Sequence, residues 1–63
     1  MNQEVIFTVN LGDAEALALA QFLKRVGWSE MRQNAVDEDE AYLIRAGLDQ
    51  VRAALADVGF SPR

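Results

Sequence analysis

The sequence predicts a small α+β domain of the order strand-helix-helix, with a short helical turn between the two main helices. Three observations lead to this fold class. Residues 3–11 alternate between apolar and polar side chains, two longer stretches repeat apolar side chains every three or four positions, and glycines separate these segments. The length of 63 residues allows one domain, residues 1–63.

The first element is a predicted half-buried strand over residues 3–11. Its apolar face consists of Val5, Phe7, Val9 and Leu11. A lone strand leaves unpaired backbone N–H and C=O groups along both edges. We therefore expect it to pair with the same strand of a second copy across a two-fold dimer, with an irregular segment of this chain, or with a strand of another protein.

The second element is a helix over residues 14–26, made mostly of strong helix formers. Asp13 is a good N-cap for it, and Gly27 is suited to end it in a left-handed conformation with Trp28 folded back onto the last turn. The predicted apolar stripe consists of Ala16, Leu19, Phe22 or Leu23, and Val26. The same Val-Gly-aromatic-Ser order returns at residues 58–61, so the same device is expected to end the last helix.

A single helical turn is predicted over residues 29–34, capped by Ser29, and a second long helix over residues 38–58. Asp37 starts that helix, and Glu40 three residues later resembles the partner residue of a capping box. The core stripe of the long helix is expected to consist of Ile44, Leu48, Val51, Leu55 and Val58.

The composition narrows the function. Ten acidic residues against six basic ones give a net charge of -4, which disfavours direct contact with nucleic acid or an anionic membrane and favours basic protein partners. The N-terminus lacks the basic region of a signal peptide, and no apolar run is long enough to cross a membrane. We therefore expect a cytoplasmic protein.

The sequence contains few of the residue types that catalysis or cofactor binding most often uses. Histidine and cysteine are both absent, which removes the usual general base, the thiol nucleophile and the preferred ligands of zinc. We expect no enzyme activity, no metal site and no cofactor.

The four consecutive acids from Asp37 to Glu40 are the densest patch of one chemical character. They have two interpretations: a helix start where acids suit the helix dipole, or an electronegative contact surface. Two acids would satisfy the cap, so the excess keeps the second interpretation open. Carboxylates at about 1.5 Å of helical rise approach the charge spacing of duplex DNA, about 1.7 Å. The candidate partner-binding residues are Asp37, Glu38, Asp39, Glu40, Glu30 and Tyr42. Trp28 and Met31 are further apolar anchors if exposed, and Asp49 is a further acid.

The order strand-helix-helix is similar to that of the ribbon-helix-helix repressors, dimeric regulators that read DNA with the outward face of the strand ribbon. Here that face includes Glu4, Ile6, Thr8 and Asn10 and has no lysine or arginine. A DNA-binding regulator therefore remains the alternative function.

The segments Ala20–Trp28, Ala35–Tyr42 and Gly59–Arg63 resemble a family of small uncharacterised proteins of proteobacterial mobile elements and phages. Small acidic proteins of such elements are similar in size and charge to anti-CRISPR inhibitors. The resemblance implies a binding protein that occupies a basic DNA-binding surface, such as that of the Cascade complex. A structural accessory subunit or an antitoxin-like partner is a third possibility.

Overall fold

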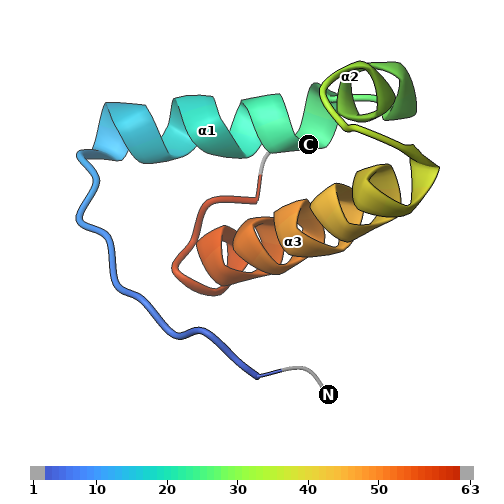
Figure 1. Ribbon diagram of the computed structural model, residues 1–63. Coiled ribbons are helices and arrows are strands. Elements are labelled where there is room, and N and C mark those ends of the chain that lie inside the picture. Colours follow the sequence, from blue (N-terminus) through green and yellow to red (C-terminus); the bar gives the residue numbers. More distant parts are fainter. Residues whose placement is uncertain (1–2, 62–63) are drawn as a thin grey trace.

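The computed structural model describes residues 3–61, and the secondary structure in that range consists of three helices (Figure 1). They are α1 (Asp13–Arg25), α2 (Trp28–Gln33) and α3 (Glu38–Asp57). Pro62 and Arg63, the last two residues of the predicted tail, lie outside the described residues. Within residues 3–61, no helix combines the length and the apolar character that crossing a lipid bilayer requires.

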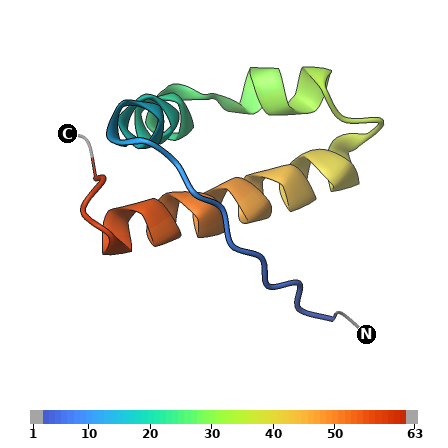
Figure 2. The ribbon, with the colours of Figure 1, turned by 90° about the vertical axis from the view of Figure 1, so that its left-hand side faces the viewer.

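The predicted α+β fold is wrong, because residues 3–61 contain no strand. Residues 3–11 are an irregular segment, which we call the arm; it leaves the start of α1 and runs past α3 (Figures 1 and 2). The alternating pattern suits an extended chain, but a strand also needs a neighbouring backbone for its hydrogen bonds. The other apolar segments of this chain are helical and satisfy their own backbone groups, so none of them is available to pair with the arm.

The helices pack around α3, which contacts both α1 and α2. The core between α1 and α3 is formed by Ala16, Ala20, Leu23 and Leu55, with Leu48 and Phe60 packed against it. Ala41, in the first turns of α3, is fully buried. Three of the five residues buried within the described range are alanines, so the core contains little side-chain volume.

The predicted stripes are only partly correct. In α1, Leu23 rather than Phe22 faces the core, since Phe22 is 56% exposed. In α3, Leu55 is buried and Val58 is 71% exposed. Ala20 was not part of the predicted stripe, although it is one of the most buried residues of the chain.

Both α1 and α2 begin with a glycine and a glutamate three residues later. The Gly12 N–H donates to Glu15 Oε1 at 2.8 Å, and the Gly27 N–H donates to Glu30 Oε1 at 2.8 Å. This is the backbone half of a capping box, because glycine has no side chain to return the second bond. The predictions of Asp13 and Ser29 as N-caps are wrong, since both residues lie inside their helices.

The end of α3 is a Schellman motif. Gly59 has a φ of 101°, its N–H donates to the Ala56 carbonyl at 3.0 Å, and the Phe60 N–H donates to the Leu55 carbonyl at 2.8 Å. The motif folds Phe60 back onto the core, as predicted. The matching prediction for Gly27 is wrong, because its φ of -105° is not left-handed and it is the N-cap of α2.

Candidate binding surface

The acidic run lies at the start of α3, where two of its members cap the helix. The Glu40 N–H donates to Asp37 Oδ1 at 2.8 Å, and the Val36 N–H donates to Glu40 Oε1 at 2.9 Å. Asp37 is the N-cap, as predicted, and the capping interpretation is confirmed for these two residues. The return bond from Glu40 reaches one residue further back than in an ordinary capping box.

Glu38 and Asp39 take no part in these two bonds. Both occupy the first turn of α3 and are exposed. Their charges suit the positive end of the helix dipole, but the cap is complete without them. They are the acids whose presence the local structure explains least.

Glu30 lies in α2 and Tyr42 in the first turns of α3, and these two helices contact each other. The Tyr42 ring lies 4.6 Å from the Trp28 ring, centroid to centroid, with the two planes tilted by 44°. A tilted aromatic pair at this separation stabilises packing beyond simple burial, so it holds the start of α2 against α3. Tyr42 still exposes 55% of its surface, whereas Trp28 and Met31 are half-buried.

Asp49 lies away from the acidic run. It lines a hollow of about 270 Å³ together with Lys24, Arg45 and Arg52, beside the apolar side chains of Leu23 and Leu48. Three of the six basic residues of the chain therefore line the same hollow as one acid. The spacing of Arg45, Asp49 and Arg52 in the sequence already predicts that these three lie on one side of the helix at ion-pair spacing. Nothing in the sequence places Lys24 of α1 beside them.

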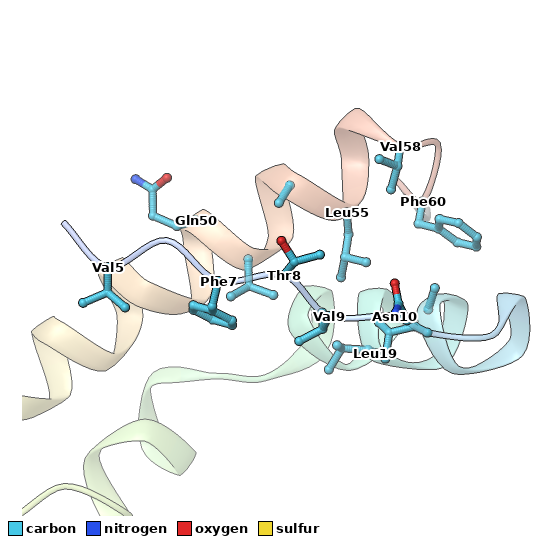
Figure 3. A pocket seen from close by; sticks show the side chains of 14 residues that line it. Val5, Phe7, Thr8, Val9, Asn10, Leu19, Gln50, Leu55, Val58 and Phe60 are labelled. Carbon is cyan, nitrogen blue, oxygen red and sulfur yellow. The ribbon is translucent and has the colours of Figure 1, made fainter.

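A larger hollow of about 620 Å³ opens between the arm, α1 and the second half of α3 (Figure 3). Its lining contains no charged residue, and its polar members are Thr8, Asn10 and Gln50. Val5, Phe7 and Val9 contribute to it from the arm, yet they remain 81%, 72% and 63% exposed. The arm therefore borders the hollow without closing it.

Among residues 3–61, no group of three acidic, histidine or cysteine side chains is placed to hold a metal ion. The arrangement instead offers three surfaces for contact: acidic, mixed-charge and apolar. Each suits recognition of another molecule.

The family model that matches this chain covers residues 1–63 and is described as a family of unknown function (DUF7706). The chain belongs to this family. No curated protein and no solved structure shows significant similarity to it.

Membership of the DUF7706 family assigns no role to any residue. Neither the resemblance to proteins of mobile elements nor the likeness to anti-CRISPR inhibitors follows from it. The candidate surfaces therefore depend on geometry and charge alone.

Proposed function

We propose that this member of the DUF7706 family is a binding protein that docks the start of α3 on a basic protein surface. The contact surface is the acidic turn, Asp37–Glu40, together with Glu30 and the exposed part of Tyr42. The observation that carries the proposal is the pair Glu38 and Asp39, which remain exposed beside a cap that Asp37 and Glu40 already complete.

The partner class follows from charge. Clustered carboxylates attract lysine and arginine side chains, and complementary charge raises the rate and fixes the orientation of association. Basic surfaces of this kind occur where proteins contact the phosphate backbone of nucleic acid. A protein that occupied such a surface would compete with nucleic acid for it. A partner of this kind acts in the cytoplasm, and the proposal puts this chain there too.

The half-exposed aromatic ring supports the same surface. Tyr42 is held by Trp28 in a fixed position, so little conformational freedom is lost when its exposed edge is covered. An ordered aromatic side chain beside charged groups is typical of an interface anchor. Glu30 contributes less freely, because one of its oxygens already accepts the Gly27 N–H.

An inhibitor of a CRISPR effector complex is the narrowest form of this proposal and stays a prediction. The ribbon-helix-helix alternative loses its structural basis, because residues 3–61 have no strand with which to form a ribbon. The accessory-subunit or antitoxin-like alternative also stays a prediction, and a fold that depends on a co-expressed chain would support it.

The decisive experiment compares two variants of equal net charge. The first carries Asp37→Asn, Glu38→Gln, Asp39→Asn and Glu40→Gln, which removes the charges of the acidic turn and keeps side chains able to cap. The control carries Glu4→Gln, Asp13→Asn, Glu15→Gln and Asp57→Asn, which removes four charges elsewhere. Both variants are tested for capture of basic nucleic-acid-binding complexes from host lysate and for binding to purified Cascade in competition with DNA.

We expect the acidic-turn variant to lose capture and the control to retain it. The loss of affinity should be at least about a hundredfold, since several charge-assisted contacts disappear together. A higher salt concentration should also lower the affinity of the wild-type protein for its partner. Equal binding by the two variants would show that net charge rather than the acidic turn matters, and would contradict the proposal.

A further inference from the structure

The surface area of this chain is large for its mass. It exposes 5490 Å², whereas a folded monomer of 7.0 kDa exposes about 4,000 Å². The excess, about 1,500 Å², is larger than the roughly 800 Å² that each partner contributes to a stable protein interface. The area is therefore sufficient for a specific contact with another chain.

Much of the exposed apolar surface lies around the hollow between the arm, α1 and α3 (Figure 3). Val5 and Phe7 are exposed on the arm, and Val58, the C-cap of α3, is 71% exposed. Protein interiors leave few voids larger than a water molecule, and a space of about 620 Å³ is far beyond that. The hollow is thus an open surface that the chain does not fill from within.

The arm and the hollow are both apolar. The hollow is lined mostly by apolar side chains, and the arm, which forms one of its walls, leaves its own apolar side chains exposed. A chain that carries both an apolar hollow and an apolar arm beside it can bind a copy of itself through one self-complementary patch. That is the arrangement of a two-fold symmetric dimer.

Charge is compatible with the same partner. Each copy has a net charge of -4, so two copies repel each other wherever their acids meet. The lining of the hollow contains no charged residue, and the acidic turn lies at the opposite end of the 20-residue helix α3 from Val58. The lining of this face therefore brings no acids of the two copies into direct contact.

We propose that a second copy of this chain covers the apolar face, with the arm of each copy packed into the hollow of the other. The arm side chains Val5, Phe7 and Val9 would contact Val51 and Val58 of α3 across the two-fold axis. The acidic turn remains outside this interface. The dimer and the proposed acidic contact can therefore fail independently.

The first test is sedimentation equilibrium of the full chain from micromolar to millimolar concentration. Two substitutions form a matched pair, because Val5 and Val36 are 81% and 83% exposed and only Val5 borders the hollow. We expect Val5→Asn to raise the dimer dissociation constant by about tenfold to a hundredfold, since it removes two apolar contacts per dimer. Val36→Asn should leave it within about twofold, because its side chain lies outside the proposed interface.

The second test identifies the face. In an equimolar mixture of isotope-labelled and unlabelled chain, filtered NOE spectra should show contacts between the Val5 and Val9 methyl groups of one copy and the Val51 and Val58 methyl groups of the other. A chain that stays monomeric at millimolar concentration would overturn the proposal. So would a dimer whose intermolecular contacts lie elsewhere, or equal weakening by the two valine variants.

Discussion

The arm of residues 3–11 and the helical part of residues 13–57 are similarly rich in apolar side chains, but only the helical part buries them within the chain. A helix satisfies its own backbone hydrogen bonds and needs a neighbour only for its apolar face. An extended segment needs a neighbour for both. The apolar pattern of the arm thus indicates which side chains can be buried, but not whether the neighbour that buries them belongs to this chain or to another.

The arm and the helical part should differ most in how much stability is lost when an apolar side chain is truncated. Leu55→Ala should lower the free energy of unfolding by about 2–5 kcal/mol, because it opens a cavity between α1 and α3. Phe7→Ala should change it by less than about 0.5 kcal/mol, because the ring is 72% exposed. Urea unfolding followed by circular dichroism, at a concentration low enough for the monomer, measures both.

A comparable loss of unfolding free energy in both variants would contradict this prediction. It would mean that the arm stabilises the helices within one chain, and the extended segment would then be part of the fold. A Leu55→Ala variant that is already unfolded in water would still show the difference, since Phe7→Ala should retain its helical signal.

A smaller effect is expected at two glycines of the helical part. Gly59→Ala should cost about 1–2 kcal/mol, because a residue with a Cβ is strained at a φ of 101°. Gly47→Ala should instead stabilise by about 0.5–1 kcal/mol, because Gly47 is inside α3 and an added Cβ meets no atom within 4 Å. Thermal unfolding of the two variants should shift the midpoint in opposite directions.

The last effect, similar in size to that at Gly47, concerns the N-cap of α3. Asp37→Ala should cost about 1 kcal/mol through loss of the bond from the Glu40 N–H, and Asp37→Asn should cost close to nothing. The midpoint of urea unfolding measures the difference. If both substitutions cost the same, the charge of Asp37 rather than its hydrogen bond would stabilise the start of α3.

The positions of the helices could be predicted because helix signals are local. The long helix was predicted over residues 38–58 and is found at Glu38–Asp57, with Asp37 as its cap. The two Val-Gly-aromatic-Ser segments show the limit of the same reasoning. Gly27 has a glutamate three residues later and starts a helix, whereas Gly59 has none and ends one.

The surfaces depend on tertiary structure to different degrees. The capping roles of Asp37 and Glu40 followed from their spacing alone. The common side of Arg45, Asp49 and Arg52 also followed from spacing, but the position of Lys24 beside them did not, because it depends on how α1 and α3 pack together. The missing strand has the same cause, since strand pairing depends on a neighbour that the sequence of the arm does not specify.

The alanine-rich core also bears on how stability varies with temperature. The heat capacity change of unfolding grows with the apolar surface that unfolding exposes, and the residues buried between positions 3 and 61 are three alanines and two leucines. For the isolated chain it should lie below the roughly 0.8 kcal/mol/K that average proteins show at 63 residues. The stability curve of the monomer is then flat, and its melting on heating is broad rather than sharp.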